Sequence, residues 1–138
     1  MIKEYQILIR EHHLDSYGHV NNATYLNLFE EARWEFCTQR GYGYQKVHES
    51  GQGPIILEVQ MKFLKELKLR ERITISLEHI SQKGKISQLF QKMTKENGEV
   101  ACELKLVAGF FDLKNRRLLL PSDEWQAVLG PAQSPPKV

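Results

Sequence analysis

The sequence has few cysteines and almost no excess of either charge. Its 138 residues include two cysteines, Cys37 and Cys102, which are too few for a disulfide framework. We expect both to be buried thiols, and they form no zinc-binding pattern. The 19 basic and 17 acidic side chains leave a net charge of +2, which argues against a general nucleic-acid-binding surface.

Long apolar runs are also lacking. No stretch approaches the roughly 18 apolar residues of a membrane span, and the first ten residues carry charges where a signal peptide has its apolar segment. These absences predict no membrane span and a cytoplasmic location. A composition of 41% hydrophobic and 26% charged residues is ordinary for a globular protein, so we expect one domain over residues 1–130. Three of the five prolines fall in residues 131–138, for which a mobile tail is predicted.

The clearest element is a helix predicted over residues 23–39. Asn21 and Asn22 can cap its first turn, and Gly41 is a typical terminator. Five apolar side chains share one arc of this helix: Tyr25, Leu28, Phe29, Ala32 and Phe36. Trp34 falls on the polar side instead, which predicts contact with another subunit or with a ligand there.

Much of the remaining sequence alternates between apolar and polar residues, as half-buried strands do. Strands are predicted at residues 5–10, 55–69, 73–78, 86–95 and 100–110, with a loop at 41–53 and turns at 83–85, 97–98 and 114–116. In the second strand, every other residue from Val59 to Phe63 is expected on a buried face, with Lys62 on the opposite face.

A short helix is predicted to close the domain, with Ser122 as its cap, Trp125 and Leu129 facing inward, and Gly130 as its terminator. The order of elements predicts an α+β fold. In such a fold, one long helix packs on a curved antiparallel sheet, here of about five strands.

Polar side chains crowd the start of the long helix, from Asp15 to Tyr25. A helix N-terminus presents unpaired N–H groups and a partial positive charge, so it can polarise a substrate carbonyl or stabilise an oxyanion. The nearby carboxylate of Asp15 would supply a general base for water or a nucleophile. Either route suits a thioester, because a thiolate is a good leaving group.

The same residues resemble the signature of a known enzyme family. The sequence is similar to hot-dog-fold acyl-CoA thioesterases of the 4-hydroxybenzoyl-CoA thioesterase type at Arg10, Asp15, the Gly-His-Val-Asn-Asn string 18–22, Tyr25 and the Phe-Glu-Glu-Ala-Arg string 29–33. The resemblance implies a central helix wrapped by an antiparallel sheet. It also implies dimers joined edge to edge, often paired into tetramers, with active sites between subunits.

The resemblance further implies roles for individual residues. Asp15 matches the catalytic carboxylate, and the backbone N–H groups of residues 20–23 match the helix entrance that polarises the thioester carbonyl. The other candidates are, for catalysis, His19 and Asn22 and, for substrate binding, Tyr17, Val20 and Tyr25. Some relatives place the working carboxylate on the helix, which leaves Glu30 and Glu31 as alternatives.

Simpler roles stay open for these residues. Asp15 suits a turn in which its carboxylate accepts nearby N–H groups, and His19 suits a loop in which hydrogen bonds fix its ring. No metal site is expected, because His12 and His13 should point to opposite sides of an extended segment.

A basic segment runs from Lys62 to Arg72, where five basic residues stand against Glu66 and Glu71. Such a cluster is either a solvated strand edge or a contact for the phosphates of coenzyme A, with Lys62 and Arg70 as candidates. The predicted activity is hydrolysis of an acyl-CoA thioester, without metal and with coenzyme A only as part of the substrate. Two alternatives are an acyl-carrier-protein thioesterase, whose basic segment docks an acidic protein, and a non-hydrolytic acyl-thioester-binding protein on the same fold.

Overall fold

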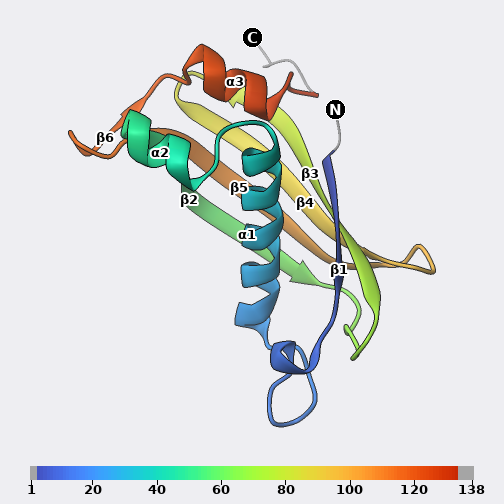
Figure 1. Cartoon of the computed structure of the whole chain (residues 1–138). Helices are drawn as coiled ribbons and strands as arrows, with labels where there is room; N and C mark the ends of the chain where they lie inside the picture. The colour runs from blue at the N-terminus through green and yellow to red at the C-terminus, as the bar shows by residue number, and fades with distance from the viewer. Residues whose placement is uncertain (1–2, 134–138) are drawn as a thin grey trace.

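A curved antiparallel sheet wraps around one long helix (Figure 1). The structure is a computed structural model that describes residues 3–133. Its strands are β1 (Lys3–Leu8), β2 (Gln52–Phe63), β3 (Arg72–Lys83), β4 (Ile86–Lys95), β5 (Val100–Asp112) and β6 (Arg117–Leu119). Its helices are α1 (Asn22–Gln39), α2 (Tyr44–Ser50) and α3 (Asp123–Leu129), and a 3-10 turn spans Glu11–His13. The strand order is β1-β3-β4-β5-β2 with β6 paired to β5, which confirms the predicted α+β architecture.

Local capping fixes where α1 begins and ends. The Asn21 side chain accepts a hydrogen bond from the Ala23 N–H at 2.8 Å, and Gly41 leaves the helix with a φ of +82°. The buried residues of α1 are Tyr25, Leu28, Phe29, Ala32, Phe36 and Cys37. The predicted apolar arc is therefore confirmed.

A buried amide ties α1 to the sheet. Gln91 of β4 is fully buried, and its Oε1 accepts a hydrogen bond from Arg33 Nη1 at 2.8 Å. Its Nε2 donates to the Phe29 carbonyl at 3.2 Å. Because a buried polar group without partners is costly, these two bonds hold α1 over β4. The backbone of α1 runs closest to β1 and β3, away from β2.

Strands β3 and β5 show the alternation that the sequence predicts. In β3 the buried apolar residues are Ile73, Ile75 and Leu77, and in β5 they are Ala101, Cys102, Leu104, Leu106, Ala108 and Phe110. Apart from Ala101, these side chains fall at alternate positions, as the predicted buried faces require. Together with the apolar arc of α1 they form the core.

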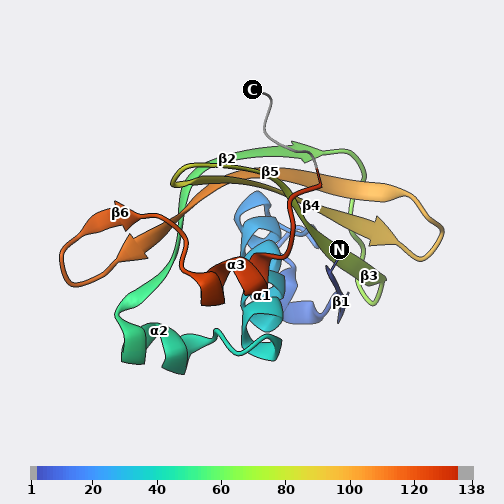
Figure 2. The same cartoon turned by 90° about the horizontal axis from the view of Figure 1, so that it is seen from above.

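Strand β2 has the predicted alternation but is not half-buried. Val59 and Phe63 pair with Leu106 and Cys102 of β5, so they lie on the face of the sheet that carries α1. Their side chains are nevertheless 44% and 51% exposed. The predicted burial is therefore wrong for Val59 and Phe63 but holds in part for Met61, which packs against the core. β1 and β2 form opposite edges of the sheet (Figure 2), and the backbone of α1 runs closest to β1 and β3.

We call the α1-facing side chains of this strand the β2 row. It consists of Pro54, Ile56, Val59, Met61 and Phe63. The bulge between Ile56 and Glu58 keeps both halves of the row on the same face.

Several element boundaries differ from the prediction; the predicted strand 73–78, for example, is β3 and extends to Lys83. The first strand covers residues 3–8 rather than 5–10, and the second ends at Phe63 rather than at residue 69. The chain leaves the sheet after Phe63 because Leu67 turns inward and is fully buried. The predicted loop at 41–53 contains α2, since its glycines lie at the ends of this helix: Gly43 precedes it and Gly51 ends it with a φ of +68°.

The closing helix is confirmed. Ser122 Oγ accepts a hydrogen bond from the Trp125 N–H at 3.2 Å, which caps α3. Trp125 stacks on Phe110 with ring centroids 5.9 Å apart, and Leu129 is buried. Through these contacts α3 packs across one end of the sheet.

The segment after α3 begins in contact with the sheet. The Gln133 N–H donates to the His79 carbonyl of β3 at 2.8 Å, so the first residues of the predicted mobile tail are held in place. The rest of that tail, residues 134–138, lies outside the described residues. No helix within residues 3–133 is both long and apolar enough to cross a membrane. Both cysteines, Cys37 and Cys102, are buried free thiols, as predicted.

Core packing predicts a sharp contrast between two leucines. Leu106 is 1% exposed and Leu120 is 65% exposed. Leu106→Ala should lower the free energy of unfolding by about 3 kcal/mol, because it leaves a cavity. Leu120→Ala should change it by less than about 0.5 kcal/mol. Urea unfolding of both variants would measure this, and similar losses would contradict the assigned core.

Candidate active site

The loop before α1 is built around the Asp15 carboxylate. Asp15 Oδ1 accepts hydrogen bonds from the Tyr17 N–H at 2.9 Å and the His19 N–H at 3.1 Å. The Asp15 N–H donates in turn to the His19 carbonyl at 2.8 Å, and Gly18 closes the turn with a φ of +80°. One carboxylate oxygen therefore fixes the loop, while Oδ2 has no hydrogen-bond partner within residues 3–133.

The first turn of α1 presents a free backbone donor beside this loop. The Ala23 N–H is bound by the Asn21 side chain, and the Thr24 and Tyr25 N–H groups are bound by the Asn21 carbonyl at 2.9 and 3.2 Å. The Asn22 N–H has no partner in the described part of the chain. It is thus the donor that remains available to a developing oxyanion at the positive end of the helix.

A shallow depression of about 390 Å³ opens at this point, and we call it the mouth. Its lining residues are His19, Val20, Asn22, Tyr25, Phe63, Leu64, Lys65 and Glu66. Tyr25 and Phe63 form its floor in an edge-to-face contact with ring centroids 5.1 Å apart. The mouth therefore joins the start of α1 to the end of β2.

Tyr25 lines the mouth with its ring. Its hydroxyl accepts a hydrogen bond from the Leu67 N–H at 3.3 Å, and burial raises the pKa of this phenol. The bond fastens the segment after β2 over the first turn of α1. Tyr25 is thus placed where a substrate-binding residue is predicted, with its polar atom already engaged.

The His19 ring points away from Asp15. Its Nε2 lies 3.3 Å from Glu66 Oε1, and both side chains are largely exposed. The backbone of His19, rather than its imidazole, holds the Asp15 carboxylate. Glu66 was not among the predicted site residues, because it contacts the helix entrance only after the chain has crossed the sheet.

Three other candidates lie outside the mouth. Tyr17 is 85% exposed and touches Asp15 only through its backbone. Glu31 accepts a hydrogen bond from the Tyr5 hydroxyl at 2.7 Å, which raises the pKa of Tyr5 to about 12. Glu30 lines a separate cavity, described below. These placements favour Asp15 over both helix carboxylates.

The basic segment does not form one cluster. Lys62 pairs with Glu103 of β5 on the outer face of the sheet, opposite the mouth. Arg70 Nη2 lies 2.6 Å from Glu11 Oε1, so its charge already has a partner. Of the five basic residues, only Lys65 lines the mouth.

The two adjacent histidines do not point apart as predicted. His12 and His13 lie in the 3-10 turn, and their rings are 4.1 Å apart. His13 Nδ1 accepts a hydrogen bond from the Arg10 N–H at 2.9 Å, and its pKa is lowered by burial. Within residues 3–133, no three His, Cys, Asp or Glu side chains form a metal-binding group.

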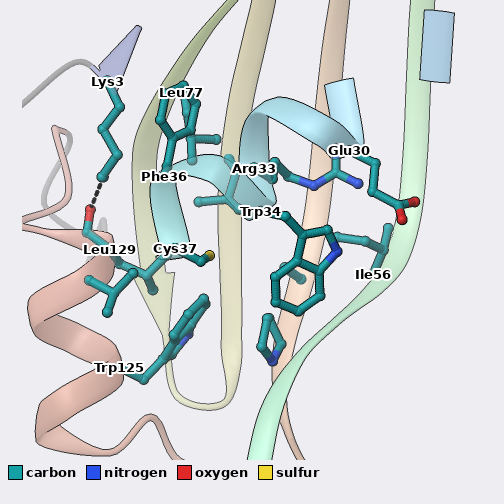
Figure 3. A pocket seen from close by; sticks show the side chains of 14 residues that line it. Lys3, Glu30, Arg33, Trp34, Phe36, Cys37, Ile56, Leu77, Trp125 and Leu129 are labelled. Carbon is teal, nitrogen blue, oxygen red and sulfur yellow. Dashed lines mark hydrogen bonds between the residues drawn. The ribbon is translucent and has the colours of Figure 1, made fainter. Parts of the chain in front are cut away.

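A second, more enclosed cavity of about 230 Å³ lies between α1, the sheet and α3 (Figure 3), and we call it the inner cavity. Trp34, Cys37 and Trp125 contribute much of its largely apolar wall. Burial raises the pKa of the Cys37 thiol to about 11, so this thiol stays protonated. Lys3 reaches the wall from β1, but its Nζ donates to the Leu129 carbonyl at the end of α3 at 2.9 Å. Trp34, for which contact with a ligand or another subunit is predicted, lines this cavity and is 39% exposed.

Comparison with known proteins identifies the family. The sequence model of the thioesterase-like superfamily matches residues 9–129. The chain belongs to this superfamily. The predictions of a hot-dog thioesterase and of thioester hydrolysis are therefore confirmed.

Individual relatives agree with this assignment. The chain is 30% identical over 125 residues to the long-chain acyl-CoA thioesterase FadM of Escherichia coli, covering 90% of this chain and 94% of FadM. It is 31% identical over 121 residues to the chloroplastic acyl-acyl carrier protein thioesterase ATL3 of Arabidopsis thaliana, covering 86% of this chain and 63% of ATL3. In fold it is similar to SAV2348 of Staphylococcus aureus, solved in complex with CoA, with a TM-score of 0.86 and 19% identity over 94% of this chain and 82% of that one.

The buried position of Lys3 predicts an unusual pH dependence. Burial lowers its pKa from 10.5 to about 8, so between these values the unfolded chain holds a proton that the folded chain lacks. The contribution of Lys3 to the free energy of unfolding should therefore rise with pH across this window and stay flat below it. Urea unfolding of wild type and Lys3→Met at several pH values isolates this term. A difference between the two proteins that does not change with pH would refute it.

Proposed function

We propose that this thioesterase acts on acyl-CoA at the mouth, with Asp15 as the base or nucleophile and the Asn22 N–H as an oxyanion donor. The observation that carries the proposal is the fixed Asp15 carboxylate, whose free oxygen lies in the loop that leads into an unpaired helix N–H. A carboxylate and an oxyanion donor are the minimum that thioester hydrolysis requires.

The chemistry can follow two routes at this site. As a base, Asp15 takes a proton from a water molecule that attacks the thioester carbonyl. As a nucleophile, it attacks the carbonyl itself and forms an acyl anhydride, which water then hydrolyses. In both routes the carbonyl oxygen becomes an oxyanion facing the start of α1, the C–S bond breaks, and coenzyme A leaves as a thiolate. The thiolate takes up the proton that Asp15 holds in the base route, or a proton from solvent in the nucleophile route. Both routes use only the acyl-CoA, one water molecule and these residues.

Coenzyme A fits the surroundings of the mouth. Lys65 lines it and has only an exposed, 3.4 Å contact with Glu99, so its ammonium group can turn toward a phosphate. FadM is named for acyl-CoA substrates, and SAV2348 was solved with CoA. We also propose a cytoplasmic location, in keeping with the two free thiols.

An acyl-carrier-protein substrate is the second candidate. It is favoured by the 31% identity to ATL3, which is named for such substrates. Lys65, which lines the mouth, would meet an acidic carrier protein. The two substrates can be compared directly by using the same acyl group on both carriers.

We further propose a homodimer that forms along β2. This strand is the edge of the sheet, is twelve residues long and pairs only with β5 among the described strands. Long edge strands with exposed apolar side chains are unstable in isolation and are normally covered. A second copy would cover the β2 row and deepen the mouth, as the edge-to-edge dimers implied by the family resemblance do.

Asp15→Asn tests the catalytic assignment. Asparagine keeps an oxygen that can accept the Tyr17 and His19 N–H groups, so the loop should persist, but it cannot accept a proton or attack efficiently. The kcat for acyl-CoA hydrolysis should fall by roughly a hundredfold or more. Release of free thiol measures the rate. Asp123→Asn, at an exposed position on α3, is the matched control and should retain full activity.

The dimer is tested by two neighbouring substitutions in β2. Val59→Lys places a charge in the β2 row, whereas Gln60→Lys places it on the outer face. Light scattering should show wild type and Gln60→Lys at twice the chain mass of 16.1 kDa, and Val59→Lys shifted toward the monomer. Unchanged mass for Val59→Lys would exclude β2 as the interface.

A further inference from the structure

We infer that Tyr25 is a positioning residue for thioester hydrolysis, because its hydroxyl holds the chain after β2 in place as one wall of the mouth. This inference rests on the proposed function and adds a residue that helps the substrate to bind without touching the reacting atoms. It follows from the partner of the hydroxyl, from the few other bonds that this part of the chain makes, and from the position of the catalytic groups on the opposite wall.

The two walls of the mouth come from distant parts of the chain. One wall is the loop and helix turn that carry Asp15 and the Asn22 N–H. The other is the end of β2 together with residues 64–67, which have no regular secondary structure and which we call the wall segment. Three residues of the wall segment line the mouth: Leu64, Lys65 and Glu66. An acyl-CoA bound there would therefore lie between a fixed helix end and an irregular stretch of chain.

The Tyr25 hydroxyl holds the end of the wall segment. It accepts the Leu67 N–H at 3.3 Å, and the two residues are only 5% and 0% exposed. Water does not reach an amide in such a place, so it cannot take over from the hydroxyl. Removal of the hydroxyl would leave a buried donor unpaired, which costs more than the hydrogen bond contributes in net terms.

Other backbone hydrogen bonds hold the wall segment only at its start. Its first two N–H groups both donate to the Ala101 carbonyl of β5, at 2.9 and 3.0 Å. The next backbone bond to another part of the fold joins the Arg70 N–H to the Ile9 carbonyl at 2.7 Å. Within residues 3–133, the Tyr25 hydroxyl is the only group from another element that binds the backbone between these two points.

The side-chain contacts of the wall segment are exposed. Glu66 Oε1 lies 3.3 Å from His19 Nε2. Lys65 Nζ lies 3.4 Å from Glu99 Oε2, and all four of these side chains are at least 44% exposed. Exposed ion pairs contribute little to stability and are screened by salt. The position of the wall segment therefore depends on Tyr25 more than on these pairs.

The ring and the hydroxyl of Tyr25 have separate roles. The ring packs edge to face on Phe63, and a phenylalanine ring would make the same contact. Among the described residues, the hydroxyl is hydrogen-bonded to Leu67 and not to Asp15 or Asn22. Loss of the hydroxyl should therefore loosen the wall that holds the substrate and leave the reacting groups in place.

Tyr25→Phe tests the inference through the two kinetic constants. The KM for acyl-CoA should rise by about five- to tenfold, because the substrate must then order the wall segment as it binds. The kcat should change by less than about twofold. Release of free thiol over a range of substrate concentrations measures both. A loss of stability alone would reduce the amount of folded enzyme, which lowers the apparent kcat but leaves KM unchanged.

Tyr42→Phe is the matched control. The Tyr42 hydroxyl donates to the Gln52 carbonyl at 3.0 Å, so this variant also removes a hydrogen bond between a buried tyrosine and the backbone. That bond lies at the start of β2, whereas the mouth lies at the end of this strand. Tyr42→Phe should be destabilised to a similar extent in urea and should keep the wild-type KM.

The same bond can also be removed from its other side. Replacement of Leu67 by its α-hydroxy acid exchanges the N–H for an ester oxygen and leaves Tyr25 unaltered. KM should rise by the same factor as in Tyr25→Phe, and the two changes together should raise it no further. Effects that multiply would overturn the inference, because the hydroxyl would then act through another partner. If Tyr25→Phe does not fold, this replacement alone decides: an unchanged KM overturns the inference.

The outcomes separate this inference from the proposed function. If Tyr25→Phe keeps the wild-type KM, whether or not its kcat falls, the inference is wrong and the proposed function stands. If wild type releases no thiol from any acyl-CoA, the proposed function fails. Calorimetric binding of coenzyme A then decides the inference. Weaker binding to Tyr25→Phe than to Tyr42→Phe supports it, and equal binding overturns it.

Discussion

The position of α1 over the sheet depends on one buried amide. Gln91 makes a hydrogen bond through each of its polar atoms, one with the Arg33 side chain and one with the Phe29 backbone. In an apolar core such a pair of bonds strongly favours one arrangement, since any other would leave the amide unpaired. These bonds fix the helix over β4, the middle strand of the order β1-β3-β4-β5-β2, and its backbone comes closest to β1 and β3, while Val59 and Phe63 of β2 stay about half exposed.

The position of α1 also sets where the two hollows lie. The mouth opens between the first turn of α1 and the end of β2, and the inner cavity lies between the later turns of α1, the sheet and α3. The chemical groups lie at the helix end, where the backbone N–H groups are free, and the apolar surface lies along its length.

Local signals in the sequence were sufficient for much of the fold. The Asn21 cap, the alternation in β5 and the Ser122 cap of α3 depend on residues close in sequence, and the sequence predicts each of them. The exposure of β2 is not predictable in this way, because periodicity shows which face of a strand a side chain lies on but not whether another element covers that face. The predicted loop 41–53 contains a helix because Gly43 and Gly51 stand at the two ends of α2 and not within it. The contacts of Gln91 with Arg33 and of His19 with Glu66 join residues far apart in the chain, so no local pattern reveals them.

The hydrogen bond between Lys3 and Leu129 joins the first described strand to the last helix, across almost the whole chain. This bond holds β1 and α3, the first strand and the last helix of the described chain, against each other. A change at the N-terminus that displaces or removes Lys3, such as a fused tag or a truncation past Lys3, would therefore also remove a hydrogen bond from the end of α3. The inner cavity, which Lys3 and Leu129 both line, would then change shape although no residue near Asp15 had been altered.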